Sequence, residues 1–278
     1  MTALERPRSL SELFSLRRAG VTFVAGGTDW IIRNRGRLSD DAVVADLSLI
    51  DEMRGISLDG GYLRIGALET MTSLHRSALV RKYASALADA AYVMGSEQIR
   101  NRATVGGNVA NSSPAADTPP ALAALGAEAV VASAEGKRRV PVEEIVGRNK
   151  NNLAEGELIK EFIIPADAER ISAFLKVGSR SQVSISRINV AAAARPQGGL
   201  YKEGRLFVGT LGVAARRCAA AEAAMGAPGL EKSLPEALCA LAAEAIPGRP
   251  TLPYKQSALR ALAQDLCAKL AESRAADE

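Results

Sequence analysis

Two pairs of adjacent glycines constrain this chain more than any other feature of its sequence. Gly26-Gly27 follows the apolar run VTFVA, and Gly106-Gly107 follows the short apolar run ATV. Glycine has no Cβ, so it adopts positive φ angles and lets a ligand approach the backbone closely. Successive N–H groups in such a turn can hold an anion. Small hydroxyl or amide residues and then an acid follow each pair, which predicts two strand-to-loop turns that hold one diphosphate from both sides.

Taken singly, either glycine pair is more often a tight turn than a binding site. Neither GGTDW nor VGGNVA matches G-x-G-x-x-G, and G-x-x-x-x-G-K-[ST] does not occur, so a Rossmann fold or a P-loop has no support. The form that the two segments share favours binding, because backbone N–H groups can neutralise a pyrophosphate without a lysine. Asp117, after the second pair, has two open interpretations: a contact to ribose or adenine, and a turn or helix cap beside Pro119.

Composition narrows the class of protein. The 278 residues allow two or three compact units, each with a core. The 35 Lys and Arg against 31 Asp and Glu give a net charge of only +4, without a long basic run, which argues against nucleic acid as a partner. Residues 1–20 lack an apolar core of signal-peptide length, and no run of about 18 apolar residues occurs. We therefore expect a cytoplasmic protein without membrane insertion.

The cysteines predict no metal site. They are odd in number, far apart and set among Ala and Leu: Cys218, Cys239 and Cys267. This pattern favours reduced thiols that fill the core over disulfides or metal ligands. His75, the only histidine, lies in a helical stretch and is interpreted as an ordinary helix residue. No residue is assigned a catalytic role.

The order of the apolar patterns predicts an α+β protein in three parts. Two small α/β subdomains are expected at residues 1–57 and 58–167, and a third part at 168–278 has strands followed by helices. The first part is predicted to contain a capped helix and two buried strands, at 9–19, 21–25 and 42–47. The second is predicted to contain strands at 62–67, 129–132 and 158–164 and a short helix at 121–125.

In the third part, residues 171–177 alternate between apolar and polar faces. This places Lys176 with Ser172 and Phe174, which fits a lysine directed at a site and equally a lysine in solvent at a sheet edge. Two amphipathic helices follow further strands, and Ser233–Glu236 is predicted to cap the first of them. The second begins near Tyr254, and its apolar stripe is Leu259, Leu262, Leu266 and Leu270.

Three stretches resemble the FAD-binding, medium subunit of the molybdenum hydroxylases, the family of the xanthine dehydrogenase and carbon monoxide dehydrogenase types. They are VAGGTDW, TVGGNVANSSPAADTPPALAALGAEAVV and FLKVGSR. The resemblance extends over nearly the whole chain and is looser toward the C-terminus. It implies that FAD lies between the two N-terminal subdomains and that the third subdomain completes the site.

The resemblance also implies which residues bind FAD. The backbone of residues 23–29 would wrap the diphosphate, and the second glycine segment would hold its other side. Asp117 would hold the ribose or adenine end, Ile159 would pack on the adenine or the ring system, and Lys176 matches a family lysine near the flavin. The whole set is Phe23, Val24, Ala25, Gly26, Gly27, Thr28, Asp29, Thr104, Gly107, Asn108, Asp117, Ile159 and Lys176.

Two segments depart from the pattern of the family. SQVSIS follows the GSR strand where an acid is usual, and GRNKNN replaces a run of small residues. Both departures concern the docking of the electron acceptor and not the binding of FAD. Arg180 and Arg187 flank the first segment, and they fit either solvated side chains or a role in steering a nicotinamide phosphate or a partner subunit.

The function implied by the resemblance is that of one subunit in a larger oxidoreductase. Such a subunit takes electrons from a 2Fe-2S small subunit and passes them to NAD or another acceptor. A separate large subunit with the molybdenum cofactor oxidises the substrate. Two alternatives stay open: a stand-alone FAD-dependent oxidase or reductase of the same architecture, and a nucleotide-binding scaffold without redox function.

Overall fold

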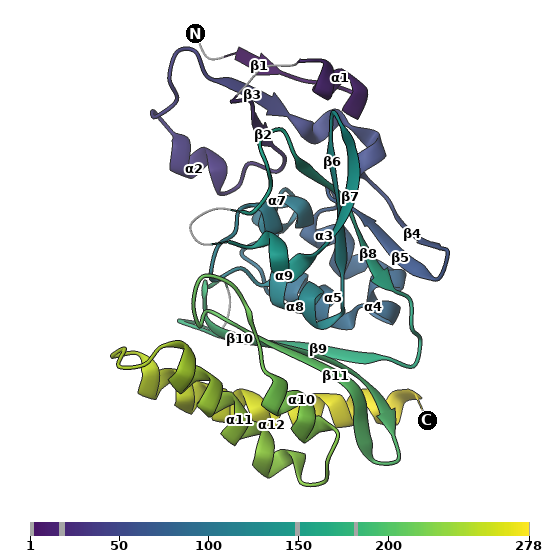
Figure 1. Ribbon diagram of the computed structural model, residues 1–278, viewed down its shortest axis with the longest axis vertical. Coiled ribbons are helices and arrows are strands. Elements are labelled where there is room, and N and C mark those ends of the chain that lie inside the picture. The colour runs from purple at the N-terminus through teal and green to yellow at the C-terminus, as the bar shows by residue number, and fades with distance from the viewer. Residues whose placement is uncertain (1–2, 17–19, 148–150, 181–182, 278) are drawn as a thin grey trace.

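Three β-sheets follow one another along the long axis of the molecule (Figure 1). The computed structural model describes residues 3–16, 20–147, 151–180 and 183–277. Each sheet is built from its own segment of the chain, and helices fill the space between the second and third sheets (Figure 1). The predicted α+β class is confirmed.

The first sheet is parallel and small. Its strands, in spatial order, are β1 (Ala3–Glu5), β3 (Val43–Asp46) and β2 (Thr22–Val24). The helix α1 (Leu10–Ser15) begins where Ser9 Oγ accepts a hydrogen bond of 3.0 Å from the Glu12 N–H, so the predicted cap is confirmed. The short helix α2 (Trp30–Asn34) follows β2, and the 3₁₀ turns η1 (Leu47–Leu49) and η2 (Asp51–Met53) lead to the second sheet.

The second sheet is antiparallel. Its strands, in spatial order, are β4 (Ile56–Asp59), β5 (Tyr62–Gly66), β8 (Leu158–Pro165), β6 (Glu128–Ser133) and β7 (Gly136–Pro141). The helices of this part are α3 (Met71–Arg76), α4 (Ala78–Tyr83), α5 (Ser85–Tyr92), α6 (Glu97–Arg100), α7 (Val105–Ala110), α8 (Thr118–Ala124) and α9 (Val142–Ile145). Their apolar residues join those of the sheet in one core around the fully buried Phe162, Leu63 and Leu122.

Two predictions for this part are wrong in detail. The segment before Gly106-Gly107 is not a strand, because Thr104 caps α7 and the glycines occupy the first turn of that helix. The helix expected from Ala121 begins at Thr118 instead. Pro119 and Pro120 fit its first turn, where a backbone N–H has no partner within the helix and its absence costs nothing.

The third sheet is antiparallel and carries the C-terminal helices on one face. Its spatial order is β12 (Arg216–Arg217), β11 (Leu200–Gly209), β10 (Ser186–Gln197) and β9 (Ile171–Gly178). The helices are α10 (Ala219–Met225), α11 (Leu230–Ala245) and α12 (Leu252–Asp277). The predicted stripe of α12 is buried against the sheet: Leu259, Leu262, Leu266 and Leu270.

The predicted cap at Ser233–Glu236 is wrong. Helix α11 begins at Leu230, after Gly229 in a left-handed conformation with φ of 80°. Ser233 lies inside the helix, and its Oγ donates a hydrogen bond of 3.2 Å to the Gly229 carbonyl one turn earlier. The Ser-x-x-Glu pattern therefore lies within the first turns of the helix and does not mark its first residue.

The alternation predicted for residues 171–177 is confirmed, since the two faces of β9 enter different cores. Ile171 and Ala173 pack with the C-terminal helices. Phe174 packs with the core of the second part, and α5 and α8 lie against this face of the sheet (Figure 1). On the same face, Ser172 Oγ accepts a buried hydrogen bond of 3.0 Å from the Ala86 N–H. The third sheet is thus fixed to the second part by packing and by polar contacts.

We propose that the three sheets mark three subdomains, at residues 1–57, 58–167 and 168–278. Strand β4 begins at Ile56, slightly before the proposed start of the second subdomain. Over the part of the chain described, no helix is long and apolar enough to cross a membrane.

The thiols of the three cysteines are free, and Cys218 and Cys239 are buried. Burial raises the pKa of each of the three thiols above its usual value, because the thiolate would lose its hydration. Cys218 lies in the core of the third part and Cys267 packs against it, as predicted, and Cys239 is a buried residue of α11 itself.

Replacing Ser172 by Ala tests the polar contact between the second and third parts. The buried Ala86 N–H would lose its acceptor, so we expect the free energy of unfolding to fall by about 1–3 kcal/mol. Ser57→Ala, on the exposed strand β4, is the control and should change it by less than about 0.5 kcal/mol. Urea unfolding measures both, and equal effects would contradict the role assigned to Ser172.

Candidate functional site

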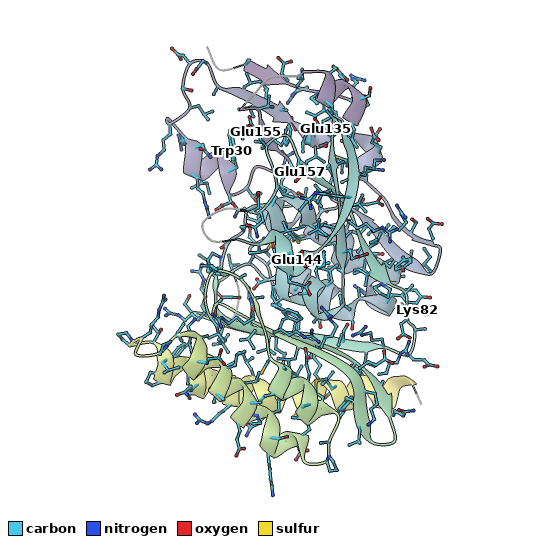
Figure 2. The ribbon with its side chains drawn as sticks, viewed as in Figure 1. Trp30, Lys82, Glu135, Glu144, Glu155 and Glu157 are labelled. Atoms are coloured by element: carbon cyan, nitrogen blue, oxygen red, sulfur yellow. The ribbon has the colours of Figure 1, made fainter. Side chains whose placement is uncertain are left out.

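The two glycine segments lie side by side and line one cavity of about 310 Å³, here called the loop pocket. It opens between the end of β2 and helix α7, and Trp30 of α2 forms part of its wall (Figure 2). The lining residues are Phe23, Val24, Ala25, Gly26, Gly27, Thr28, Asp29, Trp30, Ala103, Thr104, Gly107, Asn108, Ala110, Asn111 and Asn151. Ten of the thirteen residues predicted to bind the cofactor are among them: residues 23–29, Thr104, Gly107 and Asn108.

The first glycine segment touches the second through its backbone. A Cβ built on Gly26 would overlap the carbonyl oxygen of Arg102, so only glycine permits this approach. Gly27 has a φ of 71°, in the left-handed region. Among the described residues, no acceptor faces the backbone N–H groups of Gly26, Gly27 and Thr28. These three donors are available to an anion in the loop pocket.

The second glycine segment is built differently from the prediction. Its backbone N–H groups are occupied, because Gly106 N donates to Ala67 O at 2.9 Å and Gly107 N donates to Thr104 Oγ1 at 3.1 Å. Neither glycine of this pair has a positive φ, so the expected anion-holding turn is absent here. Gly106 instead allows close packing, since an added Cβ would lie 2.6 Å from Ala67 Cβ.

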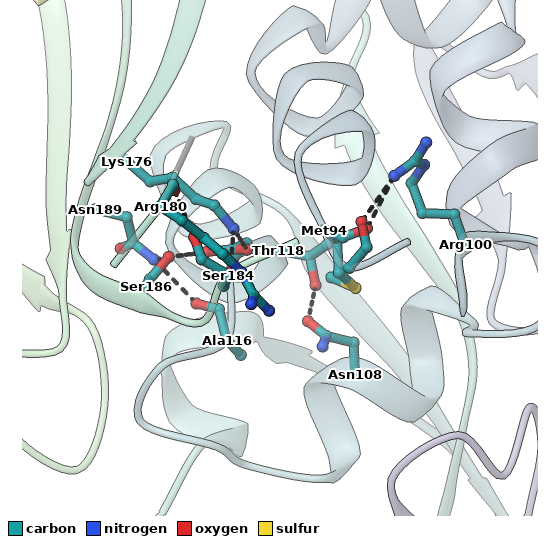
Figure 3. Close-up of polar contacts among 12 residues, drawn as sticks. Met94, Arg100, Asn108, Ala116, Thr118, Lys176, Arg180, Ser184, Ser186 and Asn189 are labelled. Atoms are coloured by element: carbon teal, nitrogen blue, oxygen red, sulfur yellow. Dashed lines mark hydrogen bonds and ion pairs between the residues drawn. The ribbon is translucent and has the colours of Figure 1, made fainter. Parts of the chain in front are cut away.

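Gly107 leaves the loop pocket open on the side of α7. An added Cβ there would meet only Thr104 Oγ1, at 2.8 Å, and nothing else within 4 Å. Asn108, the next residue, presents its side chain to the same pocket, and its Oδ1 accepts a hydrogen bond of 2.6 Å from Thr118 Oγ1 (Figure 3). The second segment therefore offers space and a side-chain amide rather than free backbone donors.

A second cavity of about 210 Å³, here called the apolar pocket, adjoins the loop pocket. Phe23, Ala25 and Gly107 line both cavities. Ile159 of β8 is buried in the wall of the apolar pocket, so the structure brings it near the glycine segments. The pKa of the Glu157 carboxyl at the rim is lowered, chiefly because Arg138 donates two hydrogen bonds of 2.7 Å to it.

Asp117 and Lys176 meet each other, outside the lining of both pockets. Lys176 Nζ lies 2.8 Å from Asp117 Oδ2, and their side chains are only 10% and 6% exposed. Asp117 Oδ1 accepts further hydrogen bonds from Ser186 Oγ at 2.5 Å and Asn189 Nδ2 at 3.0 Å, and Lys176 also donates to Ser184 O at 3.1 Å (Figure 3). The interpretation of Lys176 as a lysine in solvent is therefore wrong.

Asp117 occupies the cap position of α8, but its side chain makes no capping hydrogen bond. Its carboxylate instead connects the second part of the chain to strands β9 and β10. This buried ion pair is stabilised because each charge has a partner and the remaining oxygen has two donors.

The set predicted to bind the cofactor leaves out five residues that line the loop pocket: Trp30, Ala103, Ala110, Asn111 and Asn151. Asn151 Nδ2 donates to Ala110 O at 2.7 Å and so joins the loop after α9 to the end of α7. The polar run GRNKNN was the signal in the sequence, although its residues 148–150 lie outside the described part.

The remaining candidates lie elsewhere. Arg180 donates to Val183 O, Arg187 lies over the Tyr254 ring at 6.0 Å, and His75 stacks on Tyr92 with ring centroids 4.5 Å apart. In the described ranges, no group of three or more His, Cys, Asp or Glu is placed to hold a metal ion.

Comparison with known proteins identifies the family of this chain. Residues 1–167 match the family described as the FAD binding domain in molybdopterin dehydrogenase. The chain is 33% identical over 198 residues to the nicotinate dehydrogenase FAD-subunit of Eubacterium barkeri, covering 68% of this chain and 67% of the relative. It is also 33% identical over 203 residues to the xanthine dehydrogenase FAD-binding subunit of Escherichia coli O157:H7, covering 72% and 70%.

The structure extends these similarities to the C-terminal part. A chain of carbon monoxide dehydrogenase from Hydrogenophaga pseudoflava superimposes with a TM-score of 0.86 at 25% identity, over 96% of both chains. Quinoline 2-oxidoreductase from Pseudomonas putida 86 shares the fold, with a TM-score of 0.88. The matched family, the relatives and the fold thus define a flavoprotein subunit of an oxidoreductase. The chain belongs to the FAD-binding subunits of the molybdenum hydroxylase family, and its cofactor is FAD.

The residues present fit that cofactor. The free N–H groups of the first glycine segment suit a diphosphate, since oriented backbone donors stabilise anions without a cationic side chain. The open side of Gly107 gives the diphosphate room, and the apolar pocket next to it suits an aromatic ring system.

Gly26→Ala tests the backbone contact between the glycine segments. The added methyl group would push Arg102 away and separate the two walls of the loop pocket, so we expect FAD content to fall at least tenfold. Gly226→Ala is the control, because a Cβ there meets only Ala223 O at 3.5 Å. Flavin released per mole of protein is measured by absorbance, and a full flavin content in Gly26→Ala would contradict the contact.

Asp117→Ala tests the buried ion pair. The charge of Lys176 would lose its partner, so we expect the free energy of unfolding of the protein without cofactor to fall by about 3–5 kcal/mol. Glu128→Ala removes one partner of an exposed pair with Arg139 and should cost less than about 1 kcal/mol. Urea unfolding at pH 7 compares the two, and similar losses would show that the buried pair is dispensable.

Proposed function

We propose that this subunit takes electrons from a 2Fe-2S small subunit and passes them to NAD or another acceptor. A separate large subunit with the molybdenum cofactor would oxidise the substrate. The names of the relatives support an assembly of several chains, since they include an FAD-subunit and the carbon monoxide dehydrogenase medium chain of Hydrogenophaga pseudoflava. The cytoplasmic location expected from the sequence is part of the same proposal.

One observation carries this proposal: two glycine segments far apart in the sequence form the walls of a single pocket. A diphosphate in that pocket would accept hydrogen bonds from the N–H groups of Gly26, Gly27 and Thr28, and it would lie beside Gly107. Thr104 would act indirectly, since its hydroxyl holds the first turn of α7. Ile159 would pack against an aromatic ring in the apolar pocket.

We place Asp117 and Lys176 at the cofactor as a pair rather than as separate contacts. Asp117 fixes the ammonium group of Lys176, and Ser184 O accepts its second hydrogen bond. An ammonium group has three N–H donors, so one is left for an acceptor atom of the cofactor. The pair lies outside both pockets, so it would hold a positive group beside a part of the cofactor that extends beyond them.

Bound FAD supplies the means to take up electrons singly and release them in pairs, and the protein supplies its position and its electrostatic surroundings. The free donors of the first glycine segment bind the cofactor, the apolar pocket keeps water from its ring system, and Lys176 adds a fixed charge. These roles require no general base, and we assign none.

Two other functions make different predictions. A stand-alone oxidase or reductase would turn over substrate without any other chain, and a nucleotide-binding scaffold would purify without flavin. Purification from the native host under mild conditions distinguishes them. We expect a yellow complex that contains an iron–sulfur chain and a molybdenum-containing chain. A yellow but solitary protein with substrate turnover would favour the oxidase, and a colourless protein would favour the scaffold.

Gly107→Val tests the assignment of the loop pocket. The branched side chain would occupy the space beside α7 where the diphosphate is proposed to lie, so we expect a loss of flavin of at least tenfold. Glycine is a weaker helix former than valine, so the exchange costs no helix propensity, and the fold should survive with a shift of the Thr104 side chain, which an added Cβ would meet at 2.8 Å. Flavin absorbance and circular dichroism measure the two effects, and full flavin occupancy would remove the pocket from the proposal.

A further inference from the structure

The hydroxyl group of Thr118 is buried and faces the side chain of Asn108 (Figure 3). Its Oγ1 donates a hydrogen bond of 2.6 Å to Asn108 Oδ1. Asn108 belongs to α7 and lines the loop pocket, whereas Thr118 begins α8 and does not line it. Thr118 therefore contacts Asn108 from the side of α8, outside the loop pocket.

This bond holds the oxygen of the Asn108 amide toward Thr118 and leaves its NH₂ group for the loop pocket. A carboxamide oxygen can only accept hydrogen bonds, and its NH₂ group can only donate them. Thr118 occupies the oxygen, and within the described ranges no protein acceptor is bonded to Asn108 Nδ2. We infer that Thr118 is a positioning residue that makes Asn108 a hydrogen-bond donor to the cofactor, opposite an acceptor such as a phosphate oxygen.

Thr118 is itself held in place by the residues before it. Asn189 Nδ2 donates to Ala116 O at 3.3 Å and to Asp117 Oδ1 at 3.0 Å. Asp117 is fixed further by Lys176. Pro119 follows and fixes its own φ near −65°. A buried chain of polar contacts thus runs from β10 through residues 116–118 to Asn108.

Without the hydroxyl group, the amide of Asn108 could rotate and present its oxygen to the pocket. An oxygen there would repel a phosphate, and the NH₂ group would no longer point toward the phosphate. The expected effect of Thr118 is therefore on cofactor binding through Asn108, and this inference rests on the proposed function of the loop pocket.

Thr118→Val and Thr118→Ser form the first test. Valine keeps the shape and removes the donor, so we expect the Kd for FAD to rise about tenfold, as for one lost hydrogen bond. Serine keeps the donor, so its Kd should stay within about threefold of the wild-type value. Titration of FAD into the full-length protein without cofactor, followed by flavin fluorescence, measures each Kd. A serine variant as weak as the valine variant would overturn the inference.

A double-mutant cycle separates positioning from a general effect on the fold. If Thr118 acts through Asn108, then Thr118→Val should change the Kd by less than about twofold in a protein that already carries Asn108→Ala. A tenfold effect in that background would overturn the inference and leave the loop pocket intact. Wild-type protein that binds no FAD would instead overturn the proposed function.

Asn108→Asp tests the polarity directly. Thr118 can still donate to one carboxylate oxygen, but the other would face the pocket as a negative acceptor. Opposite a phosphate, this variant should bind FAD at least tenfold more weakly than Asn108→Ala. Binding equal to or tighter than that of Asn108→Ala would mean that the cofactor presents a donor at this position, contrary to the inference.

Discussion

The candidate site depends on a contact between two stretches of backbone. Gly26 lies directly against the Arg102 carbonyl, so at this point the backbones of the first and second parts meet without a side chain between them. Folded chains can bring main-chain segments this close only where the Cβ is missing. The contact brings Gly26 and Gly27, whose N–H groups make no hydrogen bond to the described residues, to the same cavity as Gly107. The missing side chain of Gly26 is therefore needed to bring the two segments together.

The third sheet is tied to this site by a buried charge pair. Taking Lys176 and Asp117 out of water is costly, and the cost is offset only when geometry and further hydrogen bonds are good. Ser186 and Asn189 of β10 supply those bonds. The same strand, β10, also holds residues 116–118 in place. It therefore both stabilises the Asp117–Lys176 pair and orients the wall of the loop pocket. Packing of Phe174 against the core of the second part adds an apolar component to this connection.

Local patterns in the sequence predicted the features of the fold that depend on residues close together in the chain. The period-two alternation of residues 171–177 correctly separated two cores, and the leucine stripe of α12 is buried as expected. The helical form of Gly106-Gly107 was not predictable in this way, because glycine is among the weakest helix formers and contacts with Ala67 override that preference. The partnership of Asp117 with Lys176 joins residues far apart in the chain, and no spacing rule reports such a pair. Asn151 was missed for the same reason.

The Asp117–Lys176 pair joins residues on either side of the end of the matched FAD-binding region. The matched FAD-binding region ends at residue 167, yet the partner of its most buried acid lies on β9, beyond that limit. A fragment that stopped at residue 167 would remove Lys176, Ser186 and Asn189 from Asp117, and it would expose the face of α5 and α8 that β9 and β10 cover. The unit that can keep these buried groups paired is consequently longer than the matched segment and includes the third sheet.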